Sequence, residues 1–317
     1  MVAQGADRIE VLVAGRIPDP EVGAAVAALI SRHACIRHFP ISFPVGDSSN
    51  KKNAGLRESR ANLVAFIDDD VRVAPDWPCQ VIRCFDRAEV GMYSGPSLVP
   101  DDVPLMARLS GMALASSAAG YVAERYWKGA GGLREIKWSR IIGCNMGFRK
   151  TVLESVGAFD PRFWPGEEMV ASYRTAKSGS VIMFQPEAWV YHYPRATFRG
   201  FCRQIYGYGA TRIRLVREGL EFEPMTVVPA LWVAGLAVLA LGAFLSPFCA
   251  QLLGLGLLCY LLFDGVVTLA IVLKTHRLVD ALLIGMIPVM HLCYGVAEWI
   301  EWFRPNKDLS VKTTPPK

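Results

Sequence analysis

The 317-residue sequence lacks the patterns that mark disulfide-rich, zinc-binding or nucleic-acid-binding proteins. Its eight cysteines form no Cys-x-x-Cys pair and no Cys/His cluster with zinc spacing, so we expect reduced thiols. The first seven residues lack the basic-then-apolar order of a signal peptide, which favours a cytoplasmic location for the domain that follows. Aromatic residues do not alternate with basic runs and the net charge is only +5, so no nucleic-acid partner is indicated.

Charged residues are also scarce in one part of the chain, and this divides the sequence in two. Hydrophobic residues make up 52% of the chain, and the excess lies after Thr226. Three apolar segments follow, at about 226–246, 249–273 and 279–299, each near the twenty residues that a bilayer-spanning helix needs. The sequence therefore predicts a globular domain of mixed polarity followed by membrane helices.

The number of membrane crossings stays open between two and three. Basic residues precede the first apolar segment and join the second to the third, so the positive-inside rule places both regions in the cytoplasm. A third full crossing would export a basic tail, and a re-entrant third segment would not. Asp264 lies in the middle of the second segment, where we expect it to face the interior of the helix bundle.

Three consecutive aspartates follow the short apolar run Leu63–Ile67. Such a run predicts a buried strand, and acids that follow it lie at the edge where open α/β sheets bind ligands. Asp68 and Asp70 can hold a hard divalent cation there, and the cation can hold a diphosphate. A solvated acidic turn would explain the same residues, because turns favour aspartate.

The segments before these aspartates alternate between strand and helix patterns. The sequence predicts strands at 9–14 and 36–43, helices at 20–30 and 51–61, and then the strand at 63–67. This alternation predicts an α/β fold with a doubly wound, mostly parallel sheet.

The stretch from Asn53 to Asp70 resembles a motif of the inverting family 2 glycosyltransferases. It reads Asn-Ala-Gly-Leu-Arg-Glu-Ser-Arg-Ala-Asn-Leu-Val-Ala-Phe-Ile-Asp-Asp-Asp. The resemblance implies a Rossmann-like GT-A domain, a nucleotide-sugar donor and a divalent metal, Mg²⁺ or Mn²⁺. By position it implies that Asp68 and Asp69 contact the nucleotide and that Asp70, with Asp68, ligates the metal. Lys52 and Asn53 would contribute to donor binding.

Two later segments continue the resemblance. Gly143–Asp160 is similar to a family segment that begins "glycine, x, asparagine", which implies a donor contact for Asn145. Gly166–Arg174 resembles the motif whose second acid is the catalytic base, which implies that role for Glu168, with Glu167 beside it in the catalytic site. Glutamate replaces the family's aspartate, so the geometry of the base changes by about one bond length. Taken alone, the two glutamates would also suit a solvated helix start.

The beginning of the chain departs from the family pattern. The first strand ends Ala-Gly-Arg-Ile-Pro-Asp-Pro, and only about 55 residues separate it from Asp69. This distance suits the family's second strand, so we expect the first strand-helix unit to be missing or shortened. Gly15, Arg16 or Asp19 would then supply nucleotide contacts, although Asp19 is better explained as a turn residue.

His192 and the residues after it resemble the connection between catalytic domain and membrane in polysaccharide-building relatives. The resemblance implies a metal or phosphate contact for His192, and the alternative is a histidine that caps the sheet. Basic and aromatic residues follow at helical spacing, which predicts an interfacial helix with arginines towards lipid phosphates. We therefore expect a GT-A domain at 1–200, an interfacial linker at 201–223, membrane helices at 224–300 and a polar tail at 301–317.

These patterns together predict a membrane-anchored, metal-dependent glycosyltransferase. We expect transfer with inversion from a nucleotide sugar, most simply a UDP-sugar, to a lipid-linked or polysaccharide acceptor at the inner or plasma membrane. The catalytic domain would lie in the cytoplasm, and either a homo-oligomer or an envelope-assembly complex would be its protein context. The alternative is a non-catalytic, nucleotide-binding scaffold subunit of such a complex, which the shortened start and the glutamate at position 168 would explain.

Overall fold

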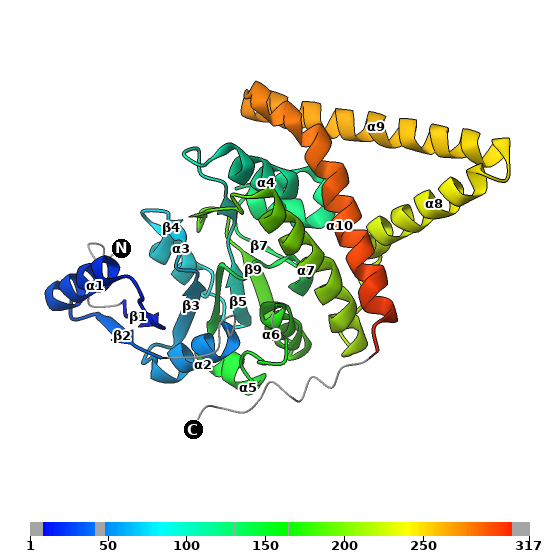
Figure 1. The fold of residues 1–317 in the computed structure, drawn as a ribbon. Helices are drawn as coiled ribbons and strands as arrows, with labels where there is room; N and C mark the ends of the chain where they lie inside the picture. Colours follow the sequence, from blue (N-terminus) through cyan, green and yellow to red (C-terminus); the bar gives the residue numbers. More distant parts are fainter. Residues whose placement is uncertain (1–8, 42–47, 130, 164, 306–317) are drawn as a thin grey trace. The chain divides into compact units, whose positions relative to one another are not determined.

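The computed structural model describes residues 9–41, 48–129, 131–163 and 165–305, which form two compact units (Figure 1). The first unit contains the described residues up to Pro96 and the segment Gly129–Val190. The second contains Ser97–Lys128 and the described residues from Tyr191 onward. This division differs from the expected domain boundary at residue 200, because the segment Ser97–Lys128 belongs with the C-terminal helices.

The chain begins with a small parallel sheet and one helix. Strand β1 (Val11–Ala14) pairs with β2 (Ile36–Phe39), and α1 (Pro20–Arg32) connects them. The carboxylate of Asp19 caps α1 by accepting a hydrogen bond from the backbone N–H of Glu21 at 2.8 Å. This cap supports the turn interpretation of Asp19 over a nucleotide contact.

A five-stranded mixed sheet forms the centre of the first unit. Its order is β3-β8-β5-β9-β7. The pair β5 and β9 is parallel, while β8 runs antiparallel to both β3 and β5, and β7 runs antiparallel to β9. The α/β prediction is confirmed, but the sheet is mixed rather than mostly parallel. The strands are β3 (Leu63–Ile67), β5 (Val90–Ser94), β7 (Arg134–Glu135), β8 (Asn145–Arg149) and β9 (Val181–Phe184).

Strand β3 lies at one end of this order and is only partly buried. All five residues of β5 are buried, whereas in β3 only Val64 is buried and Ala65 and Ile67 are exposed. The apolar run was expected to be a buried strand. It is less covered because β8 is its only neighbour in the sheet of the described chain.

Four helices and the short strand β4 complete this region. Strand β6 lies in the second unit, and the boundary between the two units falls within β10. Helix α6 packs against β9 and β5 of the main sheet. The helices are α2 (Ser48–Glu58), α3 (Trp77–Arg83), α5 (Lys150–Ser155) and α6 (Glu167–Lys177), and the strands are β4 (Val71–Val73), β6 (Ser97–Leu98) and β10 (Val190–His192).

The second unit is mostly helical. Three of its helical segments are long and apolar enough to cross a membrane: Pro224–Ala243, Pro247–Thr275 and Leu278–Phe303. The third has 26 residues, a length that suits a full crossing. The unit consists of α4 (Leu105–Ala115), η3 (Ser117–Tyr126), α7 (Phe198–Arg217), η5 (Pro224–Val227), α8 (Val228–Ala243), α9 (Pro247–Thr275), η6 (Leu278–Leu282) and α10 (Leu283–Phe303).

Helix α10 packs against α7 and α4, and this contact forms the core of the second unit. The buried side chains include Phe201 and Ile205 from α7 and Ile287 and Met290 from α10. Gly209 of α7 allows the close approach, because a Cβ atom there would lie 2.4 Å from the carbonyl oxygen of Tyr294. Helix α7, expected as an interfacial linker, therefore buries one face against α10.

A buried ion pair ties α4 to the turn between α9 and α10. The Arg108 guanidinium donates two hydrogen bonds to Asp280, at 2.7 Å and 2.6 Å, and the Thr275 hydroxyl donates a third at 2.6 Å. The Asp280 carboxylate has no exposed surface. Paired and hydrogen-bonded in this way, the two charges are compensated inside the unit.

We predict that Asp280→Asn lowers the free energy of unfolding by about 3 kcal/mol, because it leaves the Arg108 charge buried without its partner. The matched control is Asp101→Asn, which removes the exposed partner of Arg277 and should change the free energy by less than about 1 kcal/mol. Thermal unfolding of the full-length chain in detergent measures both. Equal shifts in Tm would contradict a structural role for the buried pair.

Candidate active site

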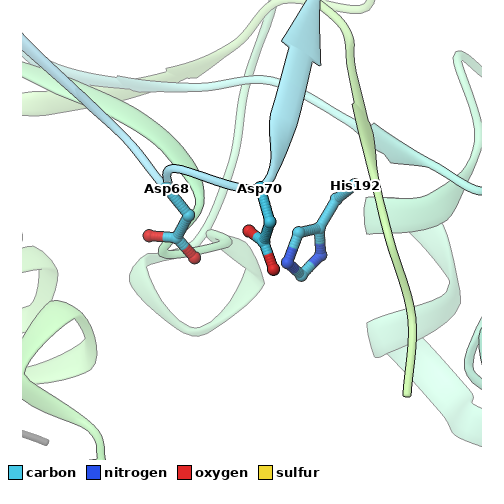
Figure 2. Close-up of side chains that lie close together, drawn as sticks. All are labelled: Asp68, Asp70 and His192. Carbon is cyan, nitrogen blue, oxygen red and sulfur yellow. The ribbon is translucent and has the colours of Figure 1, made fainter. Parts of the chain in front are cut away.

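Asp68 and Asp70 lie in the turn between β3 and β4, as close-lying carboxylates. Both side chains are exposed, and their nearest ligand oxygens lie within 4.8 Å of each other. Figure 2 shows both side chains. His192, the last residue of β10, belongs to the second unit. Asp69, between them, is also exposed. Two carboxylates so placed offer the oxygen ligands that Mg²⁺ and Mn²⁺ prefer.

Aromatic packing fixes the end of β3 from which these acids project. The ring of Phe66 makes edge contacts with Phe159, at 4.9 Å between centroids, and with Phe148 of β8, at 6.3 Å. Phe148 and Phe159 are buried. These contacts hold Phe66, two residues before Asp68, against buried aromatic rings. The core therefore fixes the position of the acidic turn.

Lys52 of α2 forms a buried ion pair with Glu167 at the start of α6. The Nζ atom lies 2.9 Å from Oε1 of Glu167, and the two side chains are only 14% and 4% exposed. The ammonium also lies 5.4 Å from the centroid of the Phe159 ring. The pair therefore joins two helices that lie more than a hundred residues apart in the sequence.

Three carboxylates act on the Lys52 ammonium. Burial lowers the pKa of Lys52, but the neighbouring carboxylates outweigh this effect and hold the pKa above its ordinary value of 10.5. They belong to Glu167, Glu168 and Asp68. Burial raises the pKa of Glu167, but the charge and hydrogen bond of Lys52 bring it below the ordinary value. Lys52 therefore stays positively charged beside the start of α6.

Glu168 is half-buried beside Gly143, a contact that the sequence motifs did not predict. A Cβ atom at Gly143 would lie 3.3 Å from Cγ and 3.4 Å from Cδ of Glu168. The glycine therefore leaves room for the glutamate side chain. The third residue of this loop-strand segment, Asn145, has a different role from the one expected.

Asn145 is a core residue rather than a surface donor contact. Its side chain is completely buried, and its amide oxygen accepts hydrogen bonds from Trp77 at 3.1 Å and Tyr93 at 3.2 Å. Its amide nitrogen donates to the carbonyls of Pro96 at 3.1 Å and Ala188 at 2.7 Å. These four bonds use the full capacity of an asparagine amide. We therefore leave Asn145 out of the donor site, because no capacity remains for a ligand.

Asn53 is committed to the backbone in a similar way. Its side chain donates to the carbonyl of Phe159 at 2.7 Å and accepts from the N–H of the same residue at 3.0 Å. The next residue, Asp160, forms ion pairs with Arg162 and Arg174. Polar residues of the sequence motifs, among them Asn53, Asp160 and Arg174, thus hold these motifs together. Asn53 therefore positions the neighbouring segment and does not face a ligand.

Comparisons with known proteins agree with this architecture. The sequence matches the model of "Glycosyl transferase family group 2" over residues 63–298. The structure is similar to the mannosyltransferase PcManGT from Pyrobaculum calidifontis in complex with GDP-Man and Mn²⁺, with a TM-score of 0.62 and 16% identity over 93% of this chain and 78% of that one. The TM-score is 0.43 for Staphylococcus aureus TarS 1–349 in complex with UDP, with 11% identity over 69% and 59% of the two chains. No curated protein sequence matches the chain.

We predict that Glu167→Gln lowers the free energy of unfolding of the first unit by about 3 kcal/mol at neutral pH, because the Lys52 charge stays buried without its partner. The folded-state pKa of Glu167 is lowered, so its contribution is fully present above the ordinary value of 4.5 and is lost as the pH falls through the folded value. Denaturant unfolding at several pH values should show a gap between wild type and variant that closes on acidification.

The matched control for this prediction is Glu154→Gln, which removes a half-exposed carboxylate 3.9 Å from Lys150. Its effect should stay below about 1 kcal/mol at every pH. If the difference in free energy of unfolding between wild type and Glu167→Gln does not narrow in acid, the ion pair is not the cause of that difference.

Proposed function

Because the chain belongs to glycosyl transferase family group 2, we propose that it transfers a sugar from a UDP-sugar, with inversion, to a lipid-linked or polysaccharide acceptor. The observation that carries this proposal is the proximity of the Asp68 and Asp70 carboxylates, whose oxygens lie within 4.8 Å of each other and could hold the metal of a metal-bound sugar nucleotide. The second acidic motif, Glu167-Glu168, begins about 100 residues later in the sequence. Its Glu167 is joined to Lys52 by an ion pair of 2.9 Å.

On the donor side, we assign the metal to Asp68 and Asp70. Their carboxylates are close enough to share one cation, and their exposure leaves space for a diphosphate. When bound, the cation would supply positive charge that stabilises the departing nucleoside diphosphate. Asp69 and Lys52 would assist donor binding, and His192 would contact the cation or a phosphate. The Mn²⁺ and GDP-Man in the PcManGT complex support a metal and a sugar nucleotide, and they make GDP-mannose the second donor to test.

On the acceptor side, Glu168 would act as the general base. The acceptor hydroxyl gives its proton to the Glu168 carboxylate while its oxygen bonds to the anomeric carbon. The bond from that carbon to the diphosphate oxygen breaks on the opposite face, and its electron pair leaves with the diphosphate. Glu167 is buried and paired with Lys52, so it would act as a positioning residue that holds the ammonium beside Glu168.

The three long apolar helices support action at a membrane. By the positive-inside rule, the basic residues around them favour a catalytic unit in the cytoplasm, and we propose the inner or plasma membrane for the helices. A membrane-embedded acceptor would reach an enzyme anchored in this way without crossing bulk water, which favours a lipid-linked or growing polysaccharide chain over a small soluble acceptor.

We predict that Asp70→Asn abolishes metal-dependent donor binding, because only one strong ligand for the cation remains in the turn. Calorimetric titration of UDP-sugars and GDP-mannose, with and without Mn²⁺, measures this loss. Asp86→Asn, an exposed acid in another turn of the same unit, is the control and should bind as wild type does. Metal-dependent affinity that survives in Asp70→Asn would remove this residue from the metal site.

We predict that Glu168→Gln keeps donor affinity and lowers the transfer rate by about 10²–10⁴-fold, because the amide cannot accept the acceptor proton. Glu168→Asp, which restores a carboxylate, should recover part of the rate. Transfer of radiolabelled sugar into membranes measures both variants. Equal loss of donor affinity in Glu168→Gln and Asp70→Asn would contradict the division of roles. Metal-dependent nucleotide binding by the wild type, without transfer or hydrolysis of any donor, would favour the scaffold function instead.

A further inference from the structure

The second unit contains a cavity of about 460 Å³ whose wall includes none of the residues assigned to the proposed transfer reaction. Residues of α4, η3, α7, η5, α8, α9 and α10 line it, so the whole wall belongs to this unit. The volume lies within the range of small-molecule sites in proteins. A cavity of this size needs a physical account, because protein interiors are normally close-packed.

The wall of this cavity is apolar and uncharged. Among the described residues that line it there is no Asp, Glu, Lys or Arg. Trp232 and Tyr260 form a stacked aromatic wall, with ring centroids 4.4 Å apart and planes inclined by 25°. A nucleotide, a sugar phosphate or a metal ion would lose its hydration there without charged partners, so these ligand classes are excluded.

The most polar side chain of the wall is already satisfied from within. His291 shares a hydrogen bond of 2.7 Å between its Nδ1 atom and the Tyr260 hydroxyl. Its other ring nitrogen, Nε2, lies 2.9 Å from the carbonyl oxygen of Ala118. Both ring nitrogens of His291 therefore have hydrogen-bond partners within the protein, and this side chain needs no polar group from a ligand. An apolar occupant fits this site better than water, which needs two to four polar partners.

Exposed apolar side chains form one side of the cavity. Met225 of η5 is 63% exposed and Val228 of α8 is 50% exposed. Both lie in the first of the helical segments long enough to cross a bilayer, and Phe263, also exposed, lies in the second. In a membrane these side chains meet hydrocarbon, so lipid chains surround this side of the wall at high concentration.

We propose that this cavity binds one hydrocarbon chain of a bilayer phospholipid. The chain would lie along the Trp232 and Tyr260 rings and leave its polar headgroup outside the uncharged wall. This proposal goes beyond the glycosyl transfer proposed above and does not rest on it.

The test blocks the cavity by filling it. Val228→Trp introduces a large ring into the cavity from its exposed side, and Val122→Trp introduces one from η3. Val238→Trp is the matched control. Val238 lies on the same helix as Val228, is 68% exposed and does not line the cavity. The full-length proteins are reconstituted into nanodiscs of phosphatidylcholine, extracted into detergent and examined by native mass spectrometry. Thermal unfolding confirms that each variant is folded.

We expect one retained phosphatidylcholine per chain in wild type and in Val238→Trp. Occupancy should fall about tenfold in both cavity variants, since overpacking a site typically costs that much binding. Equal retention in all four proteins would overturn the proposal, as would absence of a retained phospholipid in wild type. A second set of nanodiscs contains a long-chain isoprenyl phosphate beside the phosphatidylcholine. Displacement of phosphatidylcholine by this lipid would show that the cavity serves a lipid acceptor and would overturn the phospholipid assignment.

Discussion

The buried ion pair between Lys52 and Glu167 is the interaction on which the candidate active site depends. Glu167 is a negative charge that is only 4% exposed, and without a partner its burial would be costly. The Lys52 ammonium compensates it through a contact of 2.9 Å, and the charges of Glu168 and Asp68 also raise the pKa of Lys52. Its position follows from α2, whose Asn53 is bonded to the backbone of Phe159. The charge that compensates buried Glu167 therefore comes from a helix in another part of the sequence.

Sequence reasoning worked best where the signal was local. The apolar run Leu63–Ile67 predicted β3 to the residue, and the Asp-Asp-Asp that follows lies in the turn after it. Strand directions are different, because they depend on which segments become neighbours. β8 inserts between β3 and β5 and runs antiparallel to both, and nothing in the composition of Asn145–Arg149 encodes that pairing.

Polar residues within motifs were harder to interpret, since a sequence shows the residue type but not its partners. Asn145 has the chemistry of a ligand contact and lies in a family motif, yet its four hydrogen-bond positions are used by the core. Gly143 carries no functional group, yet its missing side chain is what admits Glu168. The role of each depends on the atoms within about 3–4 Å, and these come from segments far away in the sequence.

The roles of charged residues in the second unit also depend on their spatial neighbours, and here the surroundings are mostly apolar. The basic residues of α7 resembled an interfacial pattern directed at lipid phosphates, but Arg214 lies 3.1 Å from Glu301 of α10. Arg108 interrupts an apolar segment, and its partner Asp280 lies 172 residues away. An apolar surrounding makes an uncompensated charge more costly than it is in water, so such residues persist where the fold supplies an opposite charge. Basic residues next to apolar helices can therefore form ion pairs between helices or face lipid phosphates. The position of the nearest carboxylate distinguishes these two roles.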